Sequence, residues 1–443
     1  MGRWGMRWRA GLVALLLVAA QGCWLQTGYG PRRTGSNPLE QTITAANVTD
    51  LQPAWTANVS TTNPPGAVVV WQDTAYVRSS GAVTALDTAS GEARWTSGSL
   101  EGNAAPAVAD NRLWVPTSGP SCHLVAVDMA TGETLDSVLY GGPDYSNLGT
   151  SSCGSGPALS VGTKVVANWN YLAFVPAPRC PQGAWDFESG IAALDHGAEG
   201  GRWDVTRQIS GCGTPPLPPP ITRYLAPSSD GRSVFVPADD GIAAAYRVAD
   251  CGRTTATGPC QATWSRTVGE GMAAPPVALD NGDLAVPMAD GRIVVVDAAT
   301  GASRWTGTVG AAVTVPLAAT ATTVFAAASD GTVAAFPAGG CGEATCEPEW
   351  TATTSAPASA APSIGGDVVY VGDGAGGVSA LPAAGCGAAT CEALWTGSAA
   401  EGVTGPPVVS DGTLYVPGSA MGEEGAVGTV TAFRVSTPSL QSR

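Results

Sequence analysis

This 443-residue chain contains eleven cysteines, and their spacing is the clearest indication of the chemistry that its side chains could perform. The cysteines form three sets. Cys23 stands alone, directly after an apolar stretch. Cysteines in such patterns can form disulfides, bind zinc or carry a lipid. The close pairs are Cys251 with Cys260, Cys341 with Cys346, and Cys386 with Cys391, and the widely spaced cysteines are Cys122, Cys153, Cys180 and Cys212.

The three close pairs are predicted to be local disulfides. Each pair occupies the same place in a repeated unit, in a hairpin whose usual turn residues are replaced by a longer loop. A disulfide would fix the ends of that loop and restrict the unfolded chain. The alternative is a zinc site in which Cys341, Cys346, Cys386 and Cys391 bind one ion. The spacing C-x4-C differs from the C-x-x-C-H pattern of covalent haem attachment.

The four widely spaced cysteines lie among long insertions of the second, third and fourth units. Cys122 and Cys180 lie between the second and third strands of their units, whereas Cys153 and Cys212 lie in segments that lead into the next unit. In a four-stranded meander these connections all emerge on one face. We predict that Cys122 pairs with Cys153 and Cys180 with Cys212, although four cysteines allow three pairings.

The amino terminus has the features of a bacterial export signal. Several arginines precede an apolar stretch from Gly11 to Ala20, which is shorter than the roughly 20 residues that a membrane-spanning helix needs. The sequence Ala20-Gln21-Gly22-Cys23 resembles a lipobox, so Cys23 is predicted to become the lipidated first residue. Residues 1–22 would be the signal peptide, and residues 23–36 a flexible tether. The alternative is an ordinary signal peptide cut near the end of the apolar stretch.

Other catalytic chemistry has little support in the sequence. The two histidines, His123 and His196, are too few for a three-histidine metal site, and nucleophile-elbow, phosphate-loop and zinc-protease motifs do not occur. The acidic pairs Asp239-Asp240 and Glu423-Glu424 could bind Ca²⁺ but are also typical of solvated loops. The formal net charge of −15 repels phosphate backbones, which argues against a nucleic-acid partner.

The elements that must position these residues are short β-strands. The clearest unit runs from Pro275 to Val309 and reads as four strands separated by turns at Asn281-Gly282, Asp290-Gly291 and Thr300-Gly301. The chain has 58 glycines and 34 prolines but only 13% charged residues, a composition that favours strands and turns over helices. The predicted fold class is therefore all-β.

The same unit occurs eight times along the chain. The last copy ends after its third strand, at Val435, whereas an extra Trp-containing strand from Pro53 to Val59 precedes the first complete copy. We therefore predict an eight-bladed β-propeller of four-stranded antiparallel blades over residues 37–435, in which the amino-terminal strand completes the last blade. Residues 436–443 would form a carboxyl-terminal tail.

The turn between the third and fourth strands carries a distinctive pattern. In the first unit it reads Ala85-x-Asp87-x-x-Ser90-Gly91-x-x-x-Trp95, and related residues recur in later units. This pattern resembles the tryptophan-docking repeat of propellers of the pyrroloquinoline quinone (PQQ) type, over about residues 37–435. The resemblance implies structural roles, in which the Trp packs between blades and the Asp braces the turn. These docking residues are Asp87, Trp95, Asp128, Asp195, Trp203, Asp297 and Trp305.

The PQQ-type family contains quinoprotein alcohol dehydrogenases and also cofactor-free BamB-type lipoproteins. For a dehydrogenase, the resemblance implies a catalytic Asp, acidic and amide ligands for Ca²⁺, and a Trp stacked on the quinone in the central channel. The adjacent Cys-Cys pair of the large alcohol-oxidising members does not occur in this sequence. We therefore predict no catalytic residue, metal ligand or cofactor, and keep PQQ and Ca²⁺ as the cofactors of the enzymatic alternative.

Aromatic residues gather in the insertions of the second to fourth units. Aromatic and Arg side chains are frequent anchors of binding sites, so this face is predicted to bind a protein or small molecule. The alternative is that these aromatics form a small core that packs the insertions onto the blades. The predicted binding face consists of Tyr140, Tyr145, Trp169, Tyr171, Phe174, Arg179, Trp185 and Phe187.

The sequence thus predicts an exported binding scaffold, anchored to the outer side of the cell membrane through a lipid on Cys23. Its abundance of Ala and Gly and its single lysine, Lys164, indicate a bacterium with a high-GC genome. The alternative function is a PQQ- and calcium-dependent dehydrogenase that oxidises alcohols or sugars.

Overall fold

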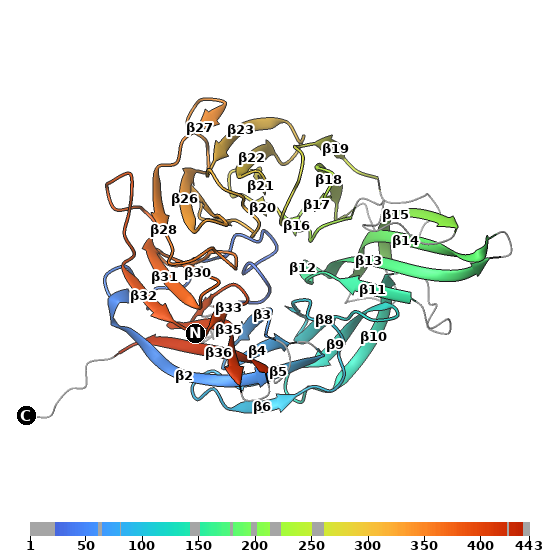
Figure 1. Cartoon of the computed structure of the whole chain (residues 1–443), viewed down its shortest axis with the longest axis horizontal. Coiled ribbons are helices and arrows are strands. Elements are labelled where there is room, and N and C mark those ends of the chain that lie inside the picture. The colour runs from blue at the N-terminus through green and yellow to red at the C-terminus, as the bar shows by residue number, and fades with distance from the viewer. Residues whose placement is uncertain are drawn as a thin grey trace, which may run out of the picture.

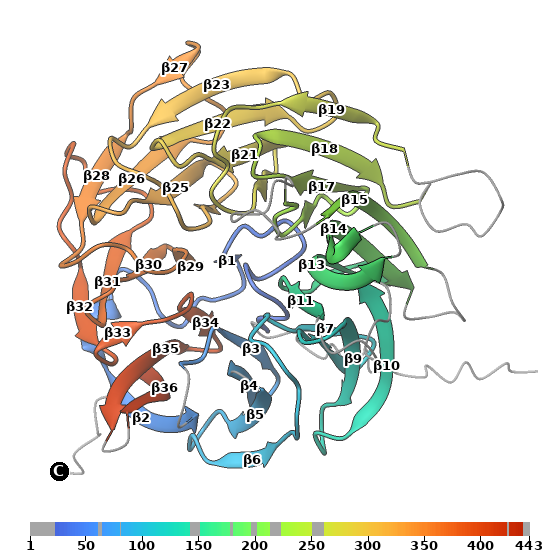
Figure 2. The same ribbon diagram turned by 45° about the vertical axis from the view of Figure 1, so that its right-hand side comes forward.

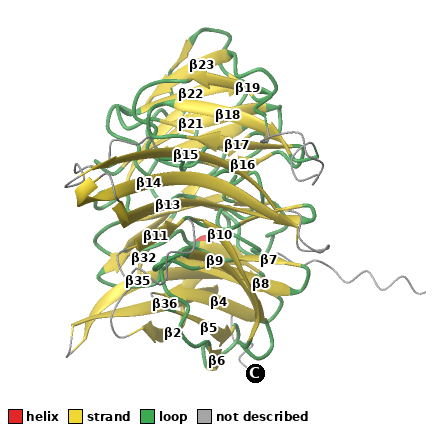
Figure 3. Ribbon diagram, turned by 90° about the vertical axis from the view of Figure 1, so that its right-hand side faces the viewer, coloured by secondary structure: helices red, strands yellow, loops and turns green. Residues whose placement is uncertain are grey.

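Each sequence repeat folds into a small antiparallel sheet, and eight such sheets surround a common axis (Figures 1 and 2). The computed structural model describes residues 23–60, 64–79, 81–141, 151–177, 180–195, 202–212, 223–249, 261–422 and 425–436. Within these ranges the side chains of residues 151, 174–177, 180–184, 202–203, 207 and 209–211 are not described. The prediction of an all-β, eight-bladed propeller is confirmed, and the described chain is almost entirely strand and loop (Figure 3).

The first four blades follow one another along the chain. Blade one contains β3 (Ala67–Trp71), β4 (Thr74–Ser79), β5 (Ala82–Asp87) and β6 (Ala93–Thr96). Blade two contains β7 (Ala107–Ala109), β8 (Arg112–Pro116), β9 (Cys122–Asp128) and β10 (Thr134–Gly141). Blade three contains β11 (Ser151–Ser155), β12 (Leu159–Val161), β13 (Lys164–Ala177), β14 (Cys180–Asp195) and β15 (Arg202–Cys212), and its long strands project beyond the ring (Figure 1). Blade four contains β16 (Ser228–Ser229), β17 (Ser233–Pro237), β18 (Ile242–Arg247) and β19 (Trp264–Thr267).

Three of the last four blades, namely blades five, seven and eight, include a strand from elsewhere in the chain. Blade five contains β20 (Val277–Ala278), β21 (Asp283–Pro287), β22 (Arg292–Asp297) and β23 (Ser303–Thr308), and β27 (Thr345–Cys346) adds to its outer edge. Blade six contains β24 (Ala318–Ala319), β25 (Thr323–Ala327), β26 (Thr332–Pro337) and β28 (Trp350–Thr353). Blade seven contains β29 (Ser363–Gly365), β30 (Val368–Gly372), β31 (Gly377–Pro382) and β32 (Trp395–Ser398), with β1 (Ser36–Asn37) parallel to β29. Blade eight contains β33 (Gly402–Val403), β34 (Val408–Ser410), β35 (Thr413–Gly422), β36 (Gly425–Val435) and β2 (Leu51–Ser60), which follows the short 3-10 helix η1 (Val48–Asp50).

Strands from the two ends of the domain close the ring. β2 pairs antiparallel with β36, with Thr56 opposite Thr431 and Ala57 opposite Val430. It therefore supplies the fourth strand of blade eight, as the extra Trp-containing segment predicted. Because β2 precedes blade one in the chain, this pairing joins the last blade to the first.

The hydrophobic core lies between neighbouring blades. In β22, Val294 and Val296 pack against blade four, whereas Ile293 and Val295 pack against blade six. Successive side chains of a strand point to opposite faces of its sheet, so a sheet covered on both sides needs apolar residues at consecutive positions. This explains the continuous Val-, Ile- and Ala-rich runs of the second and third strands.

The meander of each blade gives the propeller two different faces. The connections between first and second strands, and between third and fourth strands, emerge on one face, which we call the turn face. The connections between second and third strands, and those between blades, emerge on the opposite face, which we call the insertion face. The tip of the long β13–β14 hairpin therefore belongs to the insertion face.

Candidate functional site

Residues 24–37, which we call the axial segment, run through the centre of the propeller (Figure 2). The segment forms hydrogen bonds with all eight blades, in the order of the blades, and each contacted residue belongs to the innermost strand of its blade. From blade one to blade eight the bonds join Trp24 to Val70, Leu25 to Val108, Gln26 to Ser160, Pro31 to Ser229, Arg32 to Ala278, Thr34 to Ala319, Gly35 to Ile364 and Asn37 to Val409.

The prediction that residues 23–36 form a flexible tether is wrong. The innermost strand of each blade presents one edge of backbone N–H and C=O groups to the axis, and such groups need partners once they are buried. The axial segment supplies these partners, mostly through its own backbone. A sequence signal for this role was present, because Trp24, Leu25 and Tyr29 are large apolar residues that a solvated linker would not need.

Buried side chains fix both ends of the axial segment. Trp24 is 1% exposed and packs edge-on against Tyr29, with their ring centroids 5.4 Å apart. Asn37 is fully buried, and its Nδ2 donates to the carbonyl oxygen of Val409 at 2.9 Å. Its Oδ1 accepts from the backbone N–H of Leu39 at 3.1 Å. These contacts hold the segment in one position across the channel.

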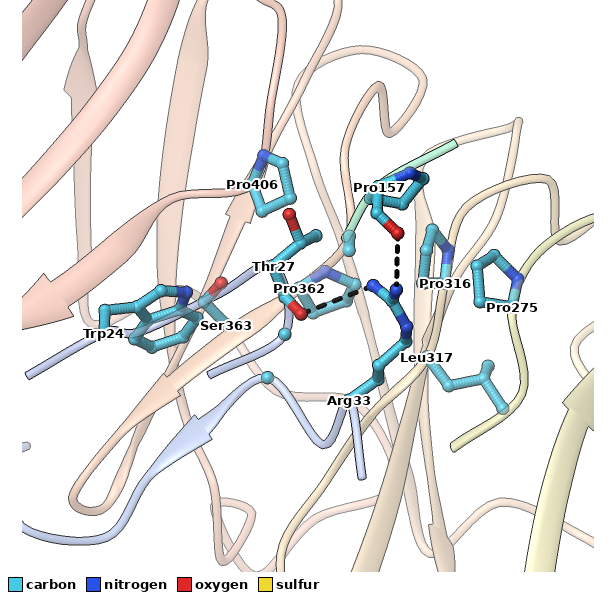
Figure 4. Close-up of a pocket in the computed structure, with 13 residues that line it drawn as sticks. Trp24, Thr27, Arg33, Pro157, Pro275, Pro316, Leu317, Pro362, Ser363 and Pro406 are labelled. Carbon is cyan, nitrogen blue, oxygen red and sulfur yellow. Dashed lines mark hydrogen bonds between the residues drawn. The ribbon is translucent and has the colours of Figure 1, made fainter. Parts of the chain in front are cut away.

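Arg33 occupies the middle of the axial segment and is 3% exposed. Its Nε donates to the carbonyl oxygen of Pro227 at 2.5 Å, and its Nη1 and Nη2 donate to the carbonyl oxygens of Thr27 and Pro157 at 3.4 and 3.5 Å (Figure 4). Burial lowers the pKa of the guanidinium to about 10, because a low-dielectric environment disfavours its charged form. Arg33 nevertheless remains a cation at neutral pH.

A cavity of about 110 Å³ lies beside Arg33 (Figure 4). Its walls are mostly apolar and come from the axial segment and from residues that enter the innermost strands of five blades. Thr27 also lines it, and the Oγ1 atom of Thr27 is buried without a hydrogen-bond partner in the described part of the chain. The proline rings of the cavity wall are Pro157, Pro275, Pro316, Pro362 and Pro406.

The residues at the axis do not fit the quinone that the family resemblance implies. The axial segment takes up the central channel, and the cavity beside it is well below the roughly 300–1,000 Å³ typical of small-molecule sites. No Asp or Glu is among the described residues that line this cavity. Across the described ranges, no three His, Cys, Asp or Glu side chains gather in a way that could hold a metal ion.

The predicted binding face consists largely of core residues where its side chains are described. Tyr140, Trp169, Tyr171, Trp185 and Phe187 are each 8% exposed or less. Tyr140, Trp169 and Tyr171 belong to a core shared by blades two and three. Trp185 and Phe187 pack on each other, with their ring centroids 5.2 Å apart. All five side chains are buried, as the alternative of a small core for the insertions requires, so they do not form an exposed binding face. Tyr145 and Arg179 lie outside the described residues, and the side chain of Phe174 is not described.

Trp169 shows why these aromatics are structural. A Cβ atom added to Gly141 or Gly190 would lie 2.4 or 2.5 Å from the Trp169 ring, so both positions need glycine. The ring therefore lies directly on the backbone of β10 and β14. A long insertion must bury apolar surface of its own to remain ordered, and here the aromatic residues provide it.

The carboxyl group of Glu188 in blade three has a strongly raised pKa. Burial, together with the nearby carboxylates of Asp186 and Asp204, raises the pKa of Glu188 to about 7. Asp186 is 8% exposed, and its Oδ2 accepts from Nε2 of Gln208 at 2.7 Å. Glu188 therefore takes up a proton close to neutral pH, within the part of blade three that extends beyond the ring.

The docking residues have the structural roles that the repeat implies. Trp95 of blade one packs on Gly132 of blade two, where an added Cβ would lie 2.5 Å from its ring, and its Nε1 donates to the carbonyl oxygen of Met129. Asp87 accepts hydrogen bonds from the Arg94 guanidinium and from the backbone N–H groups of its own turn, and these bonds lower its pKa to about 2.

Three of the other docking residues have the same structural roles, whereas Asp195 has a different partner. Asp128 and Asp297 brace their turns in the same way as Asp87, and Trp305 packs against Gly340. Asp195 instead lies 3.3 Å from Nζ of Lys164, and the side chain of Trp203 is not described.

Disulfides join Cys122 to Cys153, Cys341 to Cys346 and Cys386 to Cys391. The last two clip hairpins on the turn face, so their thiols do not form the zinc site considered as an alternative. Cys212 is also disulfide-bonded. Cys251 and Cys260 lie outside the described residues, and the side chain of Cys180 is not described.

Removal of a disulfide that closes a long loop should lower the free energy of unfolding more than removal of one that closes a short loop. Replacing Cys122 and Cys153 by Ala is expected to lower the free energy of unfolding by about 3.5 kcal/mol, because the bond closes a loop with a sequence separation of 31. The matched change at Cys386 and Cys391, with a separation of 5, should cost about 2 kcal/mol. Urea unfolding of both variants measures the difference, and a larger loss from the short loop would contradict the prediction.

The fold and axis define this protein as an eight-bladed propeller of PQQ-type repeats whose channel is filled by its own amino-terminal segment. The sequence matches the family described as outer membrane protein assembly factor BamB over residues 39–170 and 256–386, which is more than half of the chain. The chain belongs to that family. No curated protein matches the sequence.

Solved structures with the same fold include enzymes and non-enzymes. A europium-containing methanol dehydrogenase has 14% identity and a TM-score of 0.65, covering 93% of this chain and 98% of its own. The quinohemoprotein alcohol dehydrogenase ADHIIG of Pseudomonas putida HK5 has 16% identity and a TM-score of 0.64, covering 95% and 81%. BamB of Moraxella catarrhalis has 19% identity and a TM-score of 0.55, covering 87% and 99%. At these identities the likeness concerns the fold alone.

Proposed function

We propose that this protein is an exported, lipid-anchored β-propeller that serves as a binding scaffold on the outer side of the cell membrane. The observation that carries the proposal is the axial segment, which occupies the channel with the chain's own residues. A protein built in this way has its outer faces available for partners. The high-GC composition argues for a role at the cell membrane rather than in assembly of an outer membrane. No helix in the described residues is long and apolar enough to cross a membrane.

The position of Cys23 supports a defined orientation on the membrane. Trp24 forms an antiparallel bridge with Val70, which is one residue from the end of β3. In an antiparallel bridge the residue before Trp24 lies toward Trp71 and the following turn, so Cys23 lies toward the turn face. A lipid on Cys23 would have no flexible linker, since Trp24 is already bonded to blade one. The turn face would therefore lie against the membrane, and the insertion face would point away from it.

Two exposed residues allow the proposal to be tested. Leu39 on the turn face is 55% exposed, and Met421 near the tip of the β35–β36 hairpin on the insertion face is 69% exposed. With a photo-crosslinking residue at each position in living cells, we expect position 39 to crosslink to lipid and position 421 to crosslink to protein. Cys23→Ala should abolish the lipid crosslinks and move the protein to the soluble fraction.

The opposite pattern, or an unchanged membrane fraction for Cys23→Ala, would contradict the proposed anchor and orientation. A second measurement, on the purified protein, distinguishes a binding scaffold from a PQQ-dependent dehydrogenase. Titration with PQQ and Ca²⁺, followed by an assay of dye-linked alcohol oxidation, should give neither saturable binding nor turnover. Turnover would overturn the scaffold function, while the crosslinking result would still decide the orientation.

A further inference from the structure

Arg33 is a buried cation whose charge is not neutralised by the residues around it. A guanidinium carries five N–H donors, and three of them are used, all by backbone carbonyl oxygens. Two of these bonds are long, at 3.4 and 3.5 Å, and two N–H groups remain without an acceptor among the described residues. Buried charges are normally paired, because an isolated charge in a low-dielectric interior is costly.

The cavity beside Arg33 provides the space for an anion. Its volume of about 110 Å³ is several times the roughly 10–15 Å³ that one water needs, but it is too small for a large ligand. Its polar side chains are Arg33 and Thr27 of the axial segment and Ser363 of blade seven. The Ser363 hydroxyl already donates to the carbonyl oxygen of Pro407 at 2.5 Å, whereas the buried Thr27 hydroxyl has no partner in the described chain. The opposite walls are proline rings and the side chain of Leu317.

We propose that this axial cavity is a binding site for a small monocarboxylate, such as acetate or propionate. The carboxylate would accept hydrogen bonds from the free N–H groups of Arg33 and from the Thr27 hydroxyl, and the alkyl group would lie against the proline rings. Arginine binds carboxylates well because its planar group matches their two oxygens. Dianions such as sulfate are strongly hydrated and would find few polar partners on these walls.

Binding at this site would stabilise the whole ring. Both polar ligands belong to the axial segment, which contacts all eight blades, so the site exists only when the propeller is folded. A ligand that binds the folded state alone raises the unfolding temperature as its concentration increases. The inference does not depend on the lipid anchor or on the orientation proposed above.

The test compares acetate with acetamide, which has nearly the same shape but no charge. Calorimetric titration and thermal unfolding of the purified protein at constant ionic strength should show saturable binding and a raised unfolding temperature with sodium acetate only. Arg33→Gln removes the charge and should weaken acetate binding by about tenfold or more. Thr27→Val keeps the charge and the shape and should weaken binding by about threefold to tenfold.

Each outcome decides the proposal. The proposal would be overturned if acetate and acetamide raised the unfolding temperature equally, or if Arg33→Gln bound acetate as tightly as the unmodified protein. It would also be overturned if the protein bound chloride but not acetate. If Arg33→Gln does not fold, Thr27→Val decides instead, because that variant leaves the bonds of Arg33 in place. In that case, unchanged acetate affinity of a folded Thr27→Val variant would overturn the proposed site, and so would absence of acetate binding by the unmodified protein.

Discussion

Replacement of Trp24 by Ala is expected to lower the free energy of unfolding by about 3–5 kcal/mol, the usual loss for a fully buried Trp. Trp24 is 1% exposed and packs in one core with residues of blades one and eight. Its backbone forms two hydrogen bonds with Val70, each 2.9 Å long. Loss of the ring would leave a cavity at the point where the chain enters the channel. Urea unfolding followed by tryptophan fluorescence measures the effect.

A matched control lies just beyond the axial segment. Leu39 is 55% exposed, so Leu39→Ala should change the free energy of unfolding by no more than about 0.5 kcal/mol. If residues 23–36 were a solvated tether, the two substitutions would have equally small effects. An unchanged unfolding midpoint for Trp24→Ala would therefore show that the axial segment does not stabilise the ring.

The second large effect is expected where the ring closes. Trp55 belongs to β2 and packs on Gly91 of blade one, and its Nε1 donates to the carbonyl oxygen of Thr88 at 3.0 Å. Gly91 has a φ of +76°, and an added Cβ would lie 2.6 Å from the Trp55 ring. Gly91→Ala should therefore cost about 3 kcal/mol, the sum of left-handed backbone strain and of overpacking at the ring. Thermal and urea unfolding measure this loss.

Gly81 separates these two contributions. Its φ is +81°, close to that of Gly91, but no atom lies within 4 Å of the place where its Cβ would be. Gly81→Ala should therefore cost only the backbone strain, about 1–2 kcal/mol. The difference between the two variants isolates the packing of the Trp against the turn. Equal losses would mean that the contact with Trp55 does not strengthen the closure.

The fold alone does not decide the function of this chain. The same eight-bladed architecture occurs in dehydrogenases and in BamB of Moraxella catarrhalis. In this chain the inner edges of the blades are hydrogen-bonded to the axial segment. A channel filled in this way leaves beside the axial segment a cavity of only about 110 Å³, which supports our proposals of binding on the outer faces and beside Arg33.

The sequence by itself determined the blades. Strand periodicity, turn residues and the Asp-to-Trp docking pattern are local, so they predict the four-stranded units, their number and the closure by β2. The disulfides of the turn face were predictable for the same reason, because the partners Cys341 and Cys346 are only five residues apart. Each unit and each of these disulfides is specified within a few residues of chain. The closure by β2 followed from the extra strand before the first unit and the missing fourth strand of the last unit.

The tertiary structure alone decided what fills the axis and what is exposed. The partners of the axial segment, such as Ala278, Ile364 and Val409, lie far along the chain and come from eight different blades. The large apolar residues Trp24, Leu25 and Tyr29 indicate that the segment is buried, but no local pattern shows which residues it contacts. The prediction of an exposed aromatic binding face was wrong for its buried members for a similar reason, because the burial of a side chain depends on neighbours that the local sequence does not show. The sequence showed that Arg33 is present, and only the closed ring made it a buried cation beside a cavity.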